Sequence, residues 1–153
     1  MTKLLCLPGV LALLVAAAAQ SPCPAKKVKV TLVVILASEE GNTVNSKLRA
    51  IAQEVQIKNP NLTSFQLKSM ATRSLAADEK SLFPAVDDKN VAITIKHEAD
   101  KEKRVSLAVT PPDQGEIVYR CVCDKFLPIV TRYQTKNKER LILAIRVQPC
   151  KDE

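Results

Sequence analysis

Four of the five cysteines in this chain are its clearest candidates for chemistry, because the fifth, Cys6, lies in an N-terminal segment with the pattern of a removable leader. Cys121 and Cys123 stand one residue apart, and Cys23 and Cys150 lie near the two ends of the sequence. Such thiols can carry electrons, bind a metal ion or form disulfides. Thiol oxidoreductases typically use C-x-x-C at the start of a helix, and structural zinc sites use C-x(2–4)-C knuckles. This C-x-C falls at the end of a predicted strand, so its spacing favours disulfides.

An even number of cysteines in an exported chain predicts two disulfides. Two residues apart on one strand, Cα atoms are separated by about 6.5–7 Å, at the limit for a disulfide. We therefore expect Cys121 and Cys123 to bond to Cys23 and Cys150, and both pairings stay open. Such bonds would tie both chain ends to one strand and stabilise the fold by about 3–5 kcal/mol each.

The other reactive residue types do not form a catalytic motif. His97 is the only histidine, and nothing in the sequence nominates a nucleophile or an orienting acid for it. Gly41 and Gly115 are the only glycines after residue 19, so no glycine-rich loop can cradle a phosphate. We predict no enzyme activity, no catalytic residue, no cofactor and no metal site.

Arg132 and Tyr133 are the candidate partner surface. They are neighbours in a strand predicted over residues 128–133, and aromatic and arginine side chains are common at binding surfaces. Because the chain has few large side chains for its interior, packing in the core is the alternative role for Tyr133.

The first 19 residues have the pattern of a secretory signal peptide. Lys3 precedes an apolar run over residues 4–15, and alanines at 17–19 supply the small residues of a cleavage site. The run is shorter than the ~20 residues that a spanning helix needs. We expect a secreted or periplasmic protein with no membrane span after cleavage, a lead-in over residues 20–27 and one domain over residues 28–150.

The charge indicates which partners are suited to the chain. Its 23 basic and 16 acidic residues give a formal net charge of +7, and removing the leader removes only Lys3. A basic exported protein is suited to an anionic cell-surface polymer, and an envelope protein is the other predicted partner. Nucleic acid is not predicted, because the chain has no tryptophan and no basic patch interleaved with stacking aromatics.

Hydrophobic periodicity predicts an α+β fold. Residues 28–37 are rich in β-branched side chains and apolar on both faces, which is typical of a central strand. A helix is expected from about residue 43, with Asn42 or Thr43 as its cap and Pro60 beyond its end. Its apolar stripe is Val44, Leu48, Ile51, Ala52 and Val55. Antiparallel strands are expected over residues 64–69, 91–97, 104–110, 116–122, 128–133 and 141–147. One N-terminal strand and an amphipathic helix are thus followed by an antiparallel sheet or small sandwich.

Several segments together resemble a known group of proteins. They are KLR at 47–49, PNLTSFQL at 60–67, SL at 74–75, LF at 82–83, RVSL at 104–107 and ERLILAI at 139–145. This arrangement resembles exported bacterial α+β domains of unknown function. The resemblance implies an envelope or extracellular setting without enzyme activity, and it carries over no functional residue. We therefore predict an exported, non-enzymatic binding or structural domain of the cell envelope. The alternative is a thiol-redox or metal-handling protein that uses Cys121 and Cys123.

Overall fold

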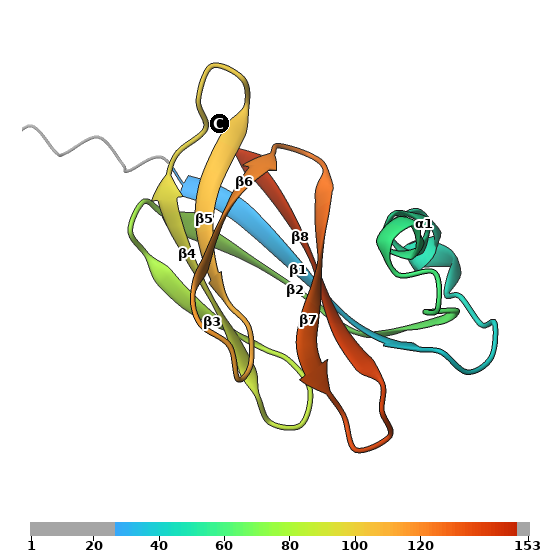
Figure 1. Ribbon diagram of the computed structural model, residues 1–153. Coiled ribbons are helices and arrows are strands. Elements are labelled where there is room, and N and C mark those ends of the chain that lie inside the picture. Colours follow the sequence, from blue (N-terminus) through green and yellow to red (C-terminus); the bar gives the residue numbers. More distant parts are fainter. Residues whose placement is uncertain (1–26, 150–153) are drawn as a thin grey trace, which may run out of the picture.

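Eight antiparallel strands form two facing sheets in the computed structural model, which describes residues 27–149 (Figure 1). Sheet A has the strand order β2-β1-β8-β7, and sheet B has the order β3-β4-β5-β6. The predicted leader, Cys23 and Cys150 lie outside the described residues. The elements are β1 (Lys27–Ser38), η1 (Ser46–Leu48), α1 (Arg49–Lys58), β2 (Ser64–Ala76), β3 (Lys80–Pro84), β4 (Asn90–His97), β5 (Arg104–Thr110), β6 (Ile117–Val122), β7 (Phe126–Gln134) and β8 (Arg140–Pro149).

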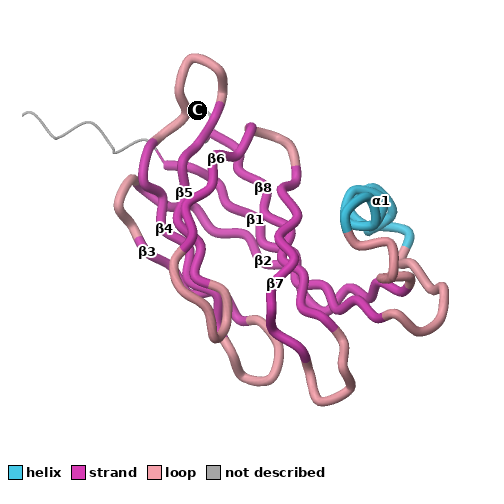
Figure 2. Tube along the Cα trace, viewed as in Figure 1, coloured by secondary structure: helices cyan, strands magenta, loops and turns pink. Residues whose placement is uncertain are grey.

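The prediction of an α+β fold is wrong, because 59% of the described residues lie in strands and only 11% in helices. Figure 2 shows the single short helix beside a body made of strands. The sequence pattern missed β3 and the second half of β2. Those residues include Arg73 and several alanines and serines, which have weak strand preferences, but β2 is held as a strand by its pairing with β1 along residues 64–76.

The helix also begins later than predicted. The Asn45 side chain caps η1 by accepting a hydrogen bond from the backbone N–H of Lys47 at 3.0 Å. Val44 instead forms a parallel β-bridge with Phe65. The end of α1 at Lys58, just before Asn59 and Pro60, agrees with the prediction.

The main core lies between the two sheets. Alternate residues of the predicted strands point into it, as their one-sided patterns indicate. β1 and β8 occupy the centre of sheet A, where they pair with each other from Val28 to Ala37. The inward residues of the central strands are Val30, Leu32 and Val34 of β1, Ile93 and Ile95 of β4, Leu107 and Val109 of β5, and Leu143 and Ile145 of β8.

A second hydrophobic cluster covers the outer face of sheet A. The buried side of α1 contributes Ile51, Ala52 and Val55, and Phe65 of β2 joins them. They pack on the outward residues of the two central strands, Val33, Ile35, Ala37, Ile142 and Ala144. β1 is therefore apolar on both faces because each face is covered, as its sequence predicts. Within the described residues, no helix is long and apolar enough to cross a membrane.

Candidate functional site

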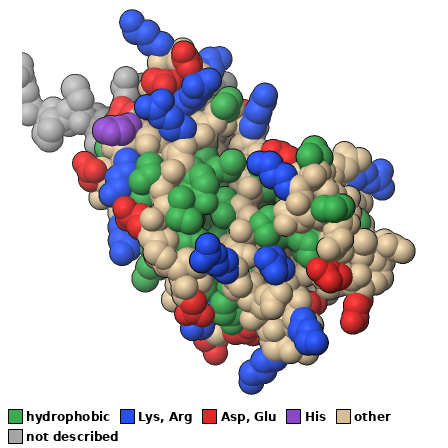
Figure 3. Space-filling view, viewed as in Figure 1, with side chains coloured by type: hydrophobic (Ala, Val, Ile, Leu, Met, Phe, Trp, Pro, Cys, Tyr) green, Lys and Arg blue, Asp and Glu red, His purple; other side chains and the backbone are tan. Residues whose placement is uncertain are grey.

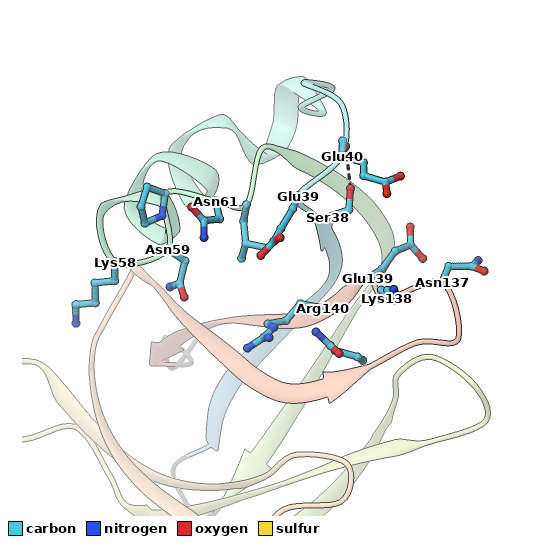
Figure 4. Close-up of a pocket in the computed structure, with 13 residues that line it drawn as sticks. Ser38, Glu39, Glu40, Lys58, Asn59, Asn61, Asn137, Lys138, Glu139 and Arg140 are labelled. Carbon is cyan, nitrogen blue, oxygen red and sulfur yellow. Dashed lines mark hydrogen bonds between the residues drawn. The ribbon is translucent and has the colours of Figure 1, made fainter.

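A cavity of about 660 Å³ lies at the end of sheet A, where three connections of the chain meet (Figure 4). We call it the end cleft. One wall is the connection after β1, the second is the end of α1 with the residues that follow, and the third is the hairpin between β7 and β8. Its lining residues are Ser38, Glu39, Glu40, Lys58, Asn59, Pro60, Asn61, Leu62, Gln134, Asn137, Lys138, Glu139 and Arg140.

One local and one long-range hydrogen bond hold the wall that follows β1. The Ser38 hydroxyl donates to the carbonyl oxygen of Glu40 at 2.9 Å, and the Thr63 N–H donates to the Ser38 carbonyl at 2.9 Å. Gly41 has a φ of +76°, in the left-handed region that favours glycine. A Cβ at this position would come within 3.0 Å of the Ser64 hydroxyl. Glu39 and Glu40 are thus held at the mouth of the cleft by a defined turn.

The end of α1 provides the second wall. The Asn59 N–H donates to the carbonyl of Val55 at 2.9 Å, and the Leu62 N–H donates to the carbonyl of Asn59 at 3.1 Å. Gln56 closes this turn by donating from Nε2 to the Leu62 carbonyl at 2.9 Å. Leu62 is buried in the second hydrophobic cluster, so the turn is anchored to sheet A.

The hairpin between β7 and β8 provides the third wall. The Thr135 N–H donates to the Glu139 carbonyl at 2.9 Å, and the Lys138 N–H donates to the Thr135 carbonyl at 3.0 Å. Lys138 adopts a φ of +62°, which completes the reversal. Arg140 then pairs with Ala37 at the end of β1. This register sets Arg140, at the start of β8, beside the connection that follows β1.

The end cleft contains charges of both signs. Its ionisable side chains are Glu39, Glu40, Glu139, Lys58, Lys138 and Arg140. Ion pairs among the described residues join Lys89 to Asp113, Lys96 to Glu116 and Arg104 to Glu102, and none involves a residue of the cleft. In Figure 4 the side chains of Glu39, Asn59 and Arg140, one from each wall, lie around the same cleft. The charges are therefore available to a ligand.

The lining suits a hydrogen-bonding ligand. Asn59, Asn61, Gln134 and Asn137 add amide donors and acceptors, and the lining residues include neither histidine nor cysteine. A neighbouring cavity of about 310 Å³ shares Ser38 and Glu139 with the cleft and adds Leu36 and Phe65 to the lining. Together the two cavities offer a polar site with an apolar extension, which is suited to a ligand that presents several kinds of group.

The structure corrects the disulfide prediction. Cys121 and Cys123 are free thiols, buried in the core between the sheets. Cys121 lies opposite Val105 of β5 and shares its inward face, so its side chain packs among apolar residues. The prediction of disulfides at these two positions is therefore wrong, and Cys23 and Cys150 lie outside the described residues.

The environment of the two thiols also differs from that of a reactive site. Burial, with a smaller contribution from Cys123, raises the pKa of Cys121 to about 11. Burial also raises the pKa of Cys123, and the nearby carboxylates of Asp124 and Asp100 act in the same direction. Reactive cysteines have lowered pKa values, because the thiolate is the nucleophile and the metal ligand. The thiol-redox alternative gains no support from this arrangement.

Arg132 and Tyr133 play different parts in the structure. Arg132 is exposed, whereas Tyr133 is half-buried and packs against the core between the sheets. The Tyr133 hydroxyl donates to the Asp87 carboxylate at 2.7 Å, and this bond raises the pKa of Tyr133. Tyr133 thus ties β7 to the connection between β3 and β4, which belongs to the opposite sheet.

His97 is exposed at the end of β4, opposite Ser106 of β5. It lines a cavity of about 230 Å³ together with charged residues that include Arg104 and Arg120. Asp100 in the same cavity shapes the turn before β5, since its Oδ1 accepts hydrogen bonds from two backbone N–H groups at 2.9 Å. Over residues 27–149, no group of three or more His, Cys, Asp or Glu side chains could hold a metal ion.

Comparisons with known proteins do not place the chain in a family. No protein-family model matches it, and no curated protein or solved structure matches it either. The resemblance to exported bacterial domains therefore stays a prediction, with its α+β part replaced by the sandwich described above.

Proposed function

We propose that this protein is an exported, non-enzymatic binding domain of the cell envelope, with the end cleft as its ligand site. The observation that carries the proposal is a cleft of about 660 Å³ whose acidic and basic side chains form no ion pair with one another. These six side chains are exposed or half-buried rather than desolvated, so they can pair with a ligand that carries charges of both signs. Connections at the end of a rigid sandwich are a common place for such sites.

The lining defines the chemistry of the ligand. Lys58 and Arg140 suit carboxylates, Glu39 and Glu139 suit ammonium groups, and the amides suit hydroxyl and amide groups. Peptidoglycan is an envelope polymer that carries all of these groups together. A purely anionic polymer would be drawn to the chain by its net charge of +7, but it would face the glutamates within the cleft. We therefore take a peptidoglycan fragment as the ligand class.

The proposal is tested by calorimetric titration of the purified protein with a soluble disaccharide-peptide from digested peptidoglycan. Arg140→Ala should weaken binding by about tenfold or more, because a hydrogen bond between charged groups is lost. Arg132→Ala is the matched control, since Arg132 is an exposed arginine outside the lining of the cleft and should leave the affinity unchanged.

Results of two kinds would contradict the proposal. The first is that the disaccharide-peptide does not bind, or that both arginine variants lose affinity equally. The second is that the fragment is cleaved during the titration, which would make the protein an enzyme. Thermal unfolding of both variants checks that Arg140→Ala acts on binding, because Arg140 is also the first residue of β8.

A further inference from the structure

The sandwich has four edge strands, and three of them carry features that block further pairing. β7 contains Pro128 and an irregular register between Val130 and Gln134. β3 has five residues and ends at Pro84. The start of β2 is covered, because Thr43 and Asn45 exchange backbone hydrogen bonds with Phe65. A register shift interrupts the pairing of β2 farther along. Prolines, bulges and covering segments are the usual means of preventing edge-to-edge association.

β6 has none of these features. It pairs with β5 without interruption from Ile117 to Val122, and it contains no proline. Its large apolar side chains are unusually open to solvent, with Ile117 41%, Val118 58% and Val122 42% exposed. These are three of the six large hydrophobic residues that are exposed in the described part of the chain. An edge of this kind is a template for another strand.

The exposed edge of β6 can be followed in the figures. β6 lies at the near edge of sheet B in Figure 1, next to β7 of the other sheet. Figure 3 shows hydrophobic side chains gathered in the middle of the same face, over the region of β6 and β7. Charged side chains, most of them basic and some acidic, lie around this apolar area. Among residues 27–149, no strand pairs with the outer edge of β6.

The segment that consists of β6 and Glu116, the residue just before it, is complementary to itself. If two copies pair antiparallel about Val118, Glu116 of each copy lies opposite Arg120 of the other. Val118 then meets its own equivalent, and Ile117 lies opposite Tyr119. Directly opposed residues share one face of a sheet, and opposite charges or an aromatic with a β-branched residue stabilise the pairing. A shift of one residue in either direction would place both charges opposite uncharged residues.

From this we propose that the protein forms a two-fold symmetric dimer through β6. The two copies of sheet B join into one continuous antiparallel sheet, with strand order β3-β4-β5-β6-β6-β5-β4-β3. Two-fold dimers use the same surface on both copies, so each contact away from the central Val118 pair occurs twice. Glu116 has a second partner within its own chain, since its carboxylate lies 3.7 Å from Lys96 Nζ. Replacing Lys96 therefore tests whether the ion pair of Glu116 within its own chain matters for dimerisation. The dimer does not depend on the end cleft, because β6 contributes no residue to its lining.

Sedimentation equilibrium of the full chain, expressed with export and purified, tests the dimer over a wide range of concentrations. The wild-type protein should show a concentration-dependent equilibrium between monomer and dimer. Glu116→Arg or Arg120→Glu should each raise the dissociation constant by about tenfold or more, because two attractive pairs become repulsive in each dimer. The double variant E116R/R120E should restore association, since it re-forms both pairs with reversed charges.

The controls separate the dimer from other effects of charge. Lys96→Ala removes the partner of Glu116 within the chain and should leave dimerisation intact. A wild-type protein that stays monomeric at all concentrations overturns the proposal. It is also overturned if both single variants dimerise like the wild type, or if the double variant fails to recover. Thermal unfolding of each variant checks that it is folded. Its unfolding temperature should be close to that of the wild type, because Glu116 and Arg120 are both exposed.

Discussion

Replacing Phe65 by alanine should lower the free energy of unfolding by about 3–5 kcal/mol. Phe65 is 1% exposed and lies in the cluster between α1 and the outer face of sheet A. Removing the aromatic ring leaves a cavity that the rigid strands of sheet A cannot move to fill. Phe65 also pairs with Ala37 of β1, near the end cleft. Chemical denaturation followed by circular dichroism measures the loss.

Leu82→Ala is the control for this prediction. Leu82 is 53% exposed on β3, so its truncation should change the free energy of unfolding by less than about 0.5 kcal/mol. Similar losses in the two variants would contradict the role of the second cluster. Weaker binding of the peptidoglycan fragment by Phe65→Ala should accompany the loss of stability, since α1 carries one wall of the cleft.

Raising the pH from about 8 to 11 should destabilise the protein through Cys121 by about 2–3 kcal/mol. The pKa of Cys121 is about 11 in the folded chain, against an ordinary value of 9.0, and burial is the main cause. The unfolded chain therefore loses this proton first as the pH rises. The stabilisation is fully present below pH 9 and is lost between pH 9 and about 11. Tyr119, whose pKa is raised by burial, contributes in the same direction.

The variant Cys121→Ala isolates this contribution. Its free energy of unfolding should decrease less between pH 8 and 11 than that of the wild type, although the smaller side chain lowers stability equally at both pH values. Equal pH dependence in the two proteins would show that the thiol ionises as readily in the folded chain as in the unfolded chain.

The strands were predictable where burial of one face produces a regular alternation of apolar and polar residues in the sequence. Val105, Leu107 and Val109 alternate because one face of β5 is covered, and β5 begins and ends as predicted. β1 is apolar on both faces because α1 covers the side away from the core. β3 was missed, because it is short and only Phe83 among its five residues is buried. Its strand conformation comes from pairing with β4, which no local pattern reveals.

The fold class and the cysteines were mispredicted for related reasons. The α+β prediction treats one amphipathic helix as a complete structural layer, whereas α1 covers only part of one face of sheet A. The even number of cysteines suggested disulfides, but the alternation that places Cys121 opposite Val105 also predicts a core position. Small apolar side chains are needed there, and cysteine provides one.

The end cleft could not be derived from local patterns. Glu39, Asn59 and Arg140 are separated by as much as about 100 residues, and each lies in a polar connection of the ordinary kind. They meet because β1 pairs with β8, which sets Arg140 opposite Ala37, and because α1 packs on the same end of sheet A. The only indication of the end cleft in the sequence is that its residues lie in polar turns next to buried helices and strands.

Titration of the isotopically labelled protein with the disaccharide-peptide, followed by amide chemical shifts, locates the ligand site most directly. The end cleft predicts that the largest shifts fall on residues 38–41, 58–62 and 134–140, from three separate parts of the chain. The amides of β5 and of the turn after β4 should stay unchanged. Shifts confined to sheet B, or no shifts at all, would contradict a ligand site at the end of sheet A.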